Sequence, residues 1–220
     1  MAKIFISADI EGISGISLRD FTSSKSHGWE LGRKYMAEDI NAAIEGILAA
    51  SPESEIVVRD AHGGSDNIIL EKLHPGVTLI SGWPHNFNML QGLDSTFDAC
   101  FFIGYHSRAL VPGGVLSHTF NRIVRKVTIN GAVVGESGIN AFLAGGDNVP
   151  VALITGDDKL KQEVSKILPD TGVAVVKIGI SRECSEMLPR AKSKELIKNA
   201  AVEAVKNIKN LKPFLPGSRL

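Results

Sequence analysis

The sequence predicts an α/β fold in which a mostly parallel central sheet is flanked by helices. Three observations lead to this prediction. Short apolar runs alternate along the chain with longer amphipathic segments, as in repeated strand–helix units. Polar turn residues follow the apolar runs directly, which marks where strands end. Asn130-Gly131 separates two short apolar stretches and is typical of a two-residue hairpin turn, so we expect one antiparallel hairpin excursion.

Strands are expected where short apolar runs are bounded by polar residues, beginning with the run that ends at Ser7. Helices are expected where apolar residues recur at helical spacing, and Pro213 ends the last of them. The whole chain, residues 1–220, is expected to form a single α/β domain. The predicted strands are 3–8, 56–60, 77–81, 99–105, 123–129 with 132–134, 150–155 and 173–178. The predicted helices are 29–50, 66–73, 136–146, 158–168 and 193–209.

Composition excludes several classes of protein. The 24 basic and 24 acidic residues balance, and no basic stripe favours nucleic acid or an anionic membrane surface as a partner. Cys100 and Cys184 are too few and too far apart for a disulfide framework. The chain opens directly into a strand, and no apolar run has transmembrane length. We therefore expect a cytoplasmic protein.

Two carboxylates, Asp9 and Glu11, follow the first predicted strand and precede Gly12. In an open α/β sheet, ligands bind beyond the carboxyl ends of the strands. Two anionic groups placed there repel each other unless a proton or a cation lies between them. The ordinary alternative is that such carboxylates cap a helix or form a turn. However, both side chains cannot cap the same turn, so the pair favours a metal site.

Three further donors occupy similar places. His62 and His106 follow apolar runs, and Glu136 stands at the start of a predicted helix. Mixed imidazole and carboxylate ligands suit zinc better than calcium or magnesium, and five donors fit two metal ions if one carboxylate bridges them. Taken singly, each residue has another explanation. His62 can be a turn residue, His106 a buried histidine bound to the backbone, and Glu136 a charge that favours a helix N-terminus.

Several short motifs follow one another along the chain: SADIEGISG at 7–15, RDAH at 59–62, KLHP at 72–75, ISG at 80–82, GLD at 92–94, GYHSRA at 104–109, SHT at 117–119, NGAVVGESGINAFLAG at 130–145, VPVALITGDD at 149–158 and VKIGISRE at 176–183. Together and in this order, they make the sequence resemble the zinc-dependent D-aminopeptidases encoded beside bacterial dipeptide transporters, peptidase family M55. The resemblance extends over about residues 3–190.

The resemblance implies a role for each donor. Asp9 would bridge two zinc ions, Glu11 and His106 would complete one metal site, and His62 with Glu136 the other. His118, which also lies in a stretch that could form a lid or a plain loop, matches the catalytic histidine of the family. The implied activity is release of N-terminal D-amino acids from short peptides or amino-acid amides, with hydroxide formed between two zinc ions per chain as the attacking group. A homo-oligomer is expected as well.

Three more residues are candidates for supporting roles. Asp60 is placed to fix the ring of His62 through its second nitrogen, with a helix cap as the equal alternative. Arg108 could hold a substrate carboxylate, although a surface ion pair is an equal explanation. Asn140 follows Glu136 by one helical turn and could face the site or the solvent.

Two other functions stay open from the sequence. A dinuclear site also suits another metal-dependent hydrolase, such as a phosphoesterase. Members of the family usually continue for some tens of residues beyond the equivalent of Phe214, so we expect a C-terminally short member. A non-catalytic metal-binding assembly protein on the same scaffold is therefore the second alternative.

Overall fold

The computed structural model describes residues 1–83 and 86–215, and it confirms the predicted α/β architecture. A seven-stranded sheet forms its centre, in the order β3-β2-β1-β4-β7-β8-β9. All neighbouring strands are parallel except β8 and β9. The strands are β1 (Lys3–Ala8), β2 (Glu55–Asp60), β3 (Thr78–Ile80), β4 (Ala99–Ile103), β7 (Val151–Asp157), β8 (Gly172–Ser181) and β9 (Cys184–Met187).

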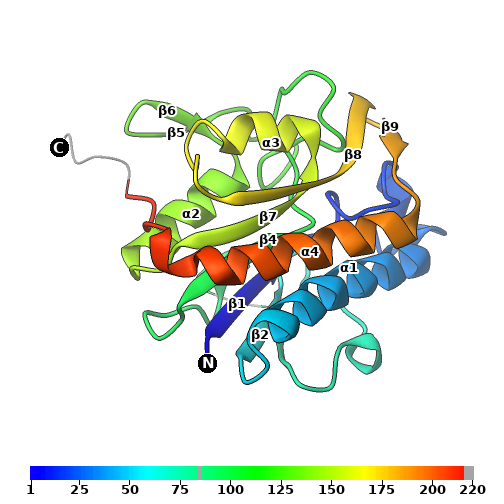
Figure 1. Ribbon diagram of the computed structural model, residues 1–220. Coiled ribbons are helices and arrows are strands. Elements are labelled where there is room, and N and C mark those ends of the chain that lie inside the picture. Colours follow the sequence, from blue (N-terminus) through cyan, green and yellow to red (C-terminus); the bar gives the residue numbers. More distant parts are fainter. Residues whose placement is uncertain (84–85, 216–220) are drawn as a thin grey trace.

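Helices cover both faces of the sheet, so the molecule has three layers (Figure 1). The helices α1 (Trp29–Ala50) and α4 (Arg190–Asn207) pack side by side over one face. The helices α2 (Glu136–Gly146) and α3 (Asp158–Val164) cover the other. Because most strands are buried on both faces, their sequences are continuous apolar runs rather than alternating ones. In the described ranges there are also four short 3-10 turns: Arg19–Phe21, Leu70–Lys72, Asn88–Leu90 and Ile208–Asn210.

The predicted hairpin is present as β5 (Val127–Ile129) and β6 (Ala132–Val134). It forms a separate two-stranded sheet beside the larger one. Asn130 and Gly131 both have positive φ, 49° and 84°. These are the conformations that a type I′ turn requires, and they are the reason why this residue pair predicts the hairpin.

One predicted helix is wrong, and one observed strand is missing from the prediction. Residues 66–73 form no α-helix, only the 3-10 turn at Leu70–Lys72. The Asp60 carboxylate accepts hydrogen bonds from the backbone N–H groups of Asn67 and Ile68 (2.6 and 2.8 Å), which holds the segment as a loop. Strand β9 is absent from the prediction because its sequence is polar and short. It pairs antiparallel with β8 at the edge of the sheet.

The register of the three central strands brings their carboxyl ends together. Ala8 at the end of β1 pairs with Asp60 in β2 and with Ile103 in β4. The residues that follow these strands therefore leave the sheet next to one another. From β1 the chain first builds the sheet in one direction, through β2 and β3, and then in the other, from β4 onward. The strand order therefore reverses between β1 and β4, and ligands of open α/β sheets bind at such a switch point.

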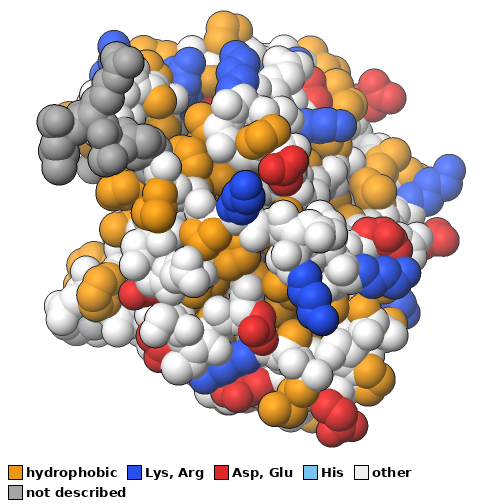
Figure 2. Space-filling view, turned by 60° about the vertical axis from the view of Figure 1, so that its left-hand side comes forward, with side chains coloured by type: hydrophobic (Ala, Val, Ile, Leu, Met, Phe, Trp, Pro, Cys, Tyr) orange, Lys and Arg blue, Asp and Glu red, His pale blue; other side chains and the backbone are white. Residues whose placement is uncertain are grey.

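The surface shows no area of a single charge sign on the face seen in Figure 2. Basic and acidic side chains are interspersed there among apolar and neutral ones. Within the described ranges, no helix has both the length and the apolar character needed to cross a membrane. The face in Figure 2 therefore offers no basic patch of the kind that binds polyanions.

Candidate metal centre

The five predicted donors meet at the carboxyl edge of the sheet. Asp9 and Glu11 follow β1, His62 follows β2, and His106 follows β4. Glu136 is the first residue of α2, which approaches from the other side. All except His62 are buried, and Asp9 is only 2 % exposed. Ionised groups this deeply buried need partners of opposite charge.

The donors form two groups that share Asp9. In the first group, His62 Nδ1 lies 3.1 Å from Asp9 Oδ1 and 3.0 Å from Glu11 Oε2. In the second, His106 Nε2 lies 3.4 Å from Asp9 Oδ2 and 3.5 Å from Glu136 Oε2. The ligand atoms of Asp9, Glu11 and His62 lie within 4.8 Å of one another, and so do those of His106, His118 and Glu136. Asp9 thus directs one oxygen toward each group, as a bridging carboxylate would.

This grouping differs from the one that the resemblance implied. Glu11 lies with His62 rather than with His106, and Glu136 lies with His106 rather than with His62. His62 follows β2, and its Nδ1 lies 3.0 Å from Glu11 Oε2. His106 follows β4 on the other side of β1, and its Nε2 lies 3.5 Å from Glu136 Oε2.

Each histidine in the centre has one ring nitrogen fixed by a backbone carbonyl. The partner of His62 Nε2 is Thr22 O at 2.8 Å, and that of His106 Nδ1 is Ser107 O at 3.0 Å. These ring nitrogens donate to the carbonyls, so His62 Nδ1 and His106 Nε2 are the nitrogens that face the carboxylates. A metal-binding histidine is commonly oriented by such a hydrogen bond.

Three buried atoms at the centre have no hydrogen-bond partner among the described residues: Asp9 Oδ2, Glu11 Oε2 and His106 Nε2. Buried polar atoms are normally satisfied, because leaving one unpaired costs about 1–3 kcal/mol. Two of these atoms are carboxylate oxygens and the third is an imidazole nitrogen. This donor set fits zinc, which takes mixed nitrogen and oxygen ligands.

The charges of the centre are strongly coupled. Burial and the neighbouring Glu11 raise the pKa of Asp9 to about 7. Burial lowers the pKa of His106, but the charges of Glu136 and Asp9 outweigh it and raise that pKa to about 10. In the same way, Glu11 and Asp9 outweigh burial and raise the pKa of His62 well above its usual value. Without metal the centre therefore holds protons at pH 7, and metal binding must displace them.

The loop after β1 requires glycine where it passes the end of β4. The backbone N–H of Gly12 donates to Gly104 O at 2.7 Å. A Cβ atom on Gly12 would lie 1.8 Å from Tyr105 O, and one on Gly104 would lie 2.3 Å from Asp9 O. Gly104 also has a φ of +74°. The glycine after Glu11 thus allows the two ligand-bearing loops to come together.

A buried lysine fixes the same loop from the far half of the sheet. Lys177 in β8 is 1 % exposed. Its ammonium group donates to the carbonyl oxygens of Glu11 at 2.6 Å, Ile13 at 3.0 Å and Ile16. Burial lowers the pKa of Lys177 to about 8, so the group is charged at pH 7. The charge is compensated by carbonyl dipoles of the loop that carries Asp9 and Glu11.

His118 lies beside the second group, and its ring faces the opening. The ring stacks on that of His106 with centroids 4.1 Å apart, and Nε2 is 3.9 Å from Glu136 Oε1. Its Nδ1 is held by Leu116 O at 2.9 Å. Leu116 and Phe120 on either side have positive φ values of 50° and 57°, which are strained for non-glycine residues. Burial and the charge of His106 lower the pKa of His118.

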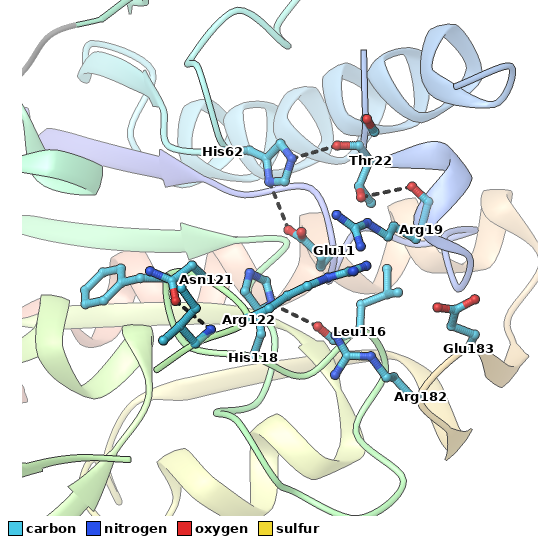
Figure 3. Close-up of a pocket in the computed structure, with 13 residues that line it drawn as sticks. Glu11, Arg19, Thr22, His62, Leu116, His118, Asn121, Arg122, Arg182 and Glu183 are labelled. Carbon is cyan, nitrogen blue, oxygen red and sulfur yellow. Dashed lines mark hydrogen bonds and ion pairs between the residues drawn. The ribbon is translucent and has the colours of Figure 1, made fainter. Parts of the chain in front are cut away.

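A cavity of about 460 Å³ opens in front of the centre (Figure 3). This volume lies in the range of about 300–1,000 Å³ that is usual for small-molecule sites. Glu11, His62 and His118 form part of its wall. Arg19, Arg122 and Arg182 line it as well. The cavity therefore joins the candidate ligands to a wall that carries these three arginines and one further carboxylate, Glu183.

The three supporting candidates take other places than those considered from the sequence. The His62 ring is held by Thr22 O, while Asp60 accepts from backbone and side-chain N–H groups of the 62–68 loop. Arg108 does not line the cavity, and its guanidinium donates to Ala109 O. Asn140 is buried beneath the centre and donates to the hydroxyl of Tyr105. We therefore do not retain Arg108 or Asn140 as residues that contact a substrate.

Sequence reasoning missed Thr22, Lys177 and the three cavity arginines. The role of Lys177 could have been predicted, because a lysine within the apolar run 173–178 is expected to be buried and must then find polar partners. Thr22 acts through its backbone carbonyl, which no residue type reveals. The arginines occur in polar segments where exposed basic residues are common, so only their position in space distinguishes them.

The fold and the donor set define an α/β protein with a candidate two-metal centre. A family model described as D-aminopeptidase, Peptidase M55, matches residues 2–219. The chain belongs to this D-aminopeptidase family. It is 39% identical over 217 residues to the D-aminopeptidase of Bacillus subtilis (strain 168), covering 99% of this chain and 78% of that protein.

A solved structure agrees with this result. The chain superposes with a TM-score of 0.95 on the Zn-dependent D-aminopeptidase DppA from Bacillus subtilis, named as a self-compartmentalizing protease. The match has 39% sequence identity and covers 98% of this chain and 78% of that one. The fold expected from the sequence and the family resemblance are thereby both confirmed.

Proposed function

We propose that this protein is a zinc-dependent aminopeptidase that releases N-terminal D-amino acids from short peptides or amino-acid amides. Membership of the D-aminopeptidase family supports the reaction class. The observation that carries the proposal is the set of buried ligand atoms on Asp9, Glu11 and His106 that have no hydrogen-bond partner among the described residues. Glu11 lies in the wall of a cavity of substrate size, together with His62 and His118.

We assign two zinc ions to each chain, with Asp9 shared between them. Glu11 and His62 would hold one ion, and His106 and Glu136 the other. When bound, the two ions would polarise the scissile carbonyl and lower the pKa of a water molecule toward neutrality. The carbonyl oxygens of Thr22 and Ser107 keep the two histidines in the tautomers that bind metal.

His118 is assigned a catalytic rather than a metal-binding role. Leu116 O holds its Nδ1, so Nε2 is the nitrogen that exchanges a proton with the substrate. The lowered pKa of His118 favours a neutral ring at pH 7, which can accept a proton and pass it to the leaving amine. The ring lies at the cavity wall, within reach of a bound peptide.

The assembly is proposed to be a homo-oligomer. The similar Bacillus subtilis protease is named as self-compartmentalizing, which supports association of copies of this chain. Balanced surface charge agrees with self-association, because copies of a chain with no net charge do not repel each other strongly. We assign no nucleic-acid or membrane partner.

Hydrolysis of D-alanine amide and L-alanine amide tests the proposed function. We expect turnover of the D-isomer above that of the L-isomer, loss of turnover after chelation, and recovery when zinc is returned. Hydrolysis of an aryl phosphate without hydrolysis of either amide would instead assign the centre to a phosphoesterase. A zinc-loaded, folded protein that hydrolyses none of these compounds would contradict an enzymatic function.

A further inference from the structure

We propose that Arg19 and Arg122 form a clamp for the C-terminal carboxylate of a short peptide substrate. This inference rests on the proposed aminopeptidase function, because it assigns a binding site to the C-terminal end of the same peptide substrate. It would make the cavity selective for short peptides with a free carboxylate over amidated ones.

The two arginines are available for a ligand. Both line the cavity in front of the metal centre. In the part of the chain that the structure describes, neither guanidinium forms a hydrogen bond or an ion pair. The side chains extend toward one another in the opening beside Glu11 (Figure 3). Two unpaired guanidinium groups that converge on one opening favour an anionic group between them.

Each arginine is attached to the metal centre through a short, hydrogen-bonded segment. Arg19 begins the 3-10 turn Arg19–Phe21, and its carbonyl accepts from the hydroxyl of Thr22. The carbonyl of Thr22 in turn holds the ring of His62. The position of Arg19 is therefore fixed relative to the first ligand group.

The segment of Arg122 is tied to the second group. The backbone N–H of Phe120 donates to Glu136 Oε1 at 2.6 Å. Asn121 Oδ1 then accepts from the backbone N–H groups of Ile123 and Val124, at 2.8 and 3.0 Å, and so closes a turn around Arg122. The segment of Arg19 is thus linked to the first ligand group and the segment of Arg122 to the second.

Arg182, the third basic residue of the wall, is already engaged. Its guanidinium donates to Ser117 O, and its own carbonyl accepts from the N–H of Leu116 at 2.7 Å. Through these two hydrogen bonds, to Leu116 and Ser117, Arg182 fixes the segment that carries His118. This role leaves Arg19 and Arg122 as the groups free to bind a carboxylate.

The chemistry of the substrate favours this arrangement. A short peptide carries an amine at the end that is cleaved and a carboxylate at the other end. A carboxylate bound in the opening beside Glu11 needs cationic partners, because the Glu11 side chain would otherwise repel it. A guanidinium pair is the ordinary protein partner for a carboxylate, since its donors match both oxygens.

Equilibrium binding of two non-hydrolysable ligands tests the clamp without turnover. The ligands are a D-alanyl-D-alanine analogue with a methylene group in place of the scissile carbonyl, and the same analogue with a C-terminal carboxamide. Calorimetry on the zinc-loaded protein is expected to show at least about tenfold tighter binding of the carboxylate form. In the double variant Arg19→Gln/Arg122→Gln, we expect this ratio to fall to about one, with binding of the carboxamide unchanged.

Lys126→Gln is the matched control, because Lys126 is exposed near Arg122 but does not line the cavity. It should keep the preference of the wild type. Equal binding of the two analogues by the wild type, a preference that survives in the double variant, or failure to bind either analogue would overturn the clamp. Hydrolysis of D-alanine amide, measured separately, reports on the proposed function, because this amide has no carboxylate.

Discussion

Replacing His118 by alanine is expected to lower kcat by about 10²–10⁴-fold, the usual loss when a general acid or base is removed. The variant should keep the zinc content of the wild type. His118 Nε2 is 3.9 Å from Glu136 Oε1, while the tighter contacts of the centre are made by His62 and His106. The measurement is turnover of D-alanine amide together with zinc per chain.

His27→Ala serves as a control for this variant, because His27 is an exposed loop residue outside the cavity. It should leave both quantities unchanged. Full turnover in His118→Ala would refute the catalytic assignment. Loss of one zinc ion would show instead that His118 is a ligand of the second group, as its position beside His106 and Glu136 allows.

Replacing Lys177 by methionine is expected to lower the free energy of unfolding by about 2–4 kcal/mol. The change removes a buried ammonium group that donates to three carbonyl oxygens of the loop after β1. These acceptors would be left without their donor. Since the loop carries Asp9 and Glu11, zinc should also bind more weakly. Urea unfolding and zinc content measure the two effects.

Lys166→Met, an exposed substitution of the same kind, should change the urea midpoint little. The comparison separates loss of the buried hydrogen bonds from a general effect of removing a lysine. An unchanged midpoint in Lys177→Met, with zinc content equal to that of the wild type, would show that the loop does not depend on Lys177.

The ends of the strands that carry the site could be predicted from the sequence, because each apolar run there stops abruptly at polar residues. Asp9, His62 and His106 each follow a buried run, so their meeting at one edge follows from parallel pairing. The grouping of the ligands could not be read in the same way. It depends on which direction the loop after β1 turns and on where α2 begins above the sheet.

The segment 66–73 shows a second limit of sequence reasoning. The apolar residues of this segment are spaced as in a helix. However, the Asp60 carboxylate accepts hydrogen bonds from the backbone N–H groups of Asn67 and Ile68 and holds the segment as a loop. A tertiary contact of this kind overrides local preference. The helices 29–50 and 136–146 were predicted with their observed bounds, because their apolar residues face the sheet over several turns.

Metal binding by this centre should depend on pH. Coulombic attraction to the carboxylates raises the pKa of His106 to about 10 and that of His62 well above its usual value. Both rings are therefore protonated in the metal-free protein at pH 7. Zinc must displace these protons, so its affinity should fall as pH decreases.

Titration of zinc into chelator-stripped protein at pH 7 tests the central claim most directly, with elemental analysis of the product as the count of bound metal. We expect about two zinc ions per chain, accompanied by release of protons that changes the observed heat between buffers of different ionisation enthalpy. The substitution Asp9→Asn should weaken the binding of both zinc ions, because Asp9 is shared between the two ligand groups. Protein that stays folded and takes up no zinc would contradict the account.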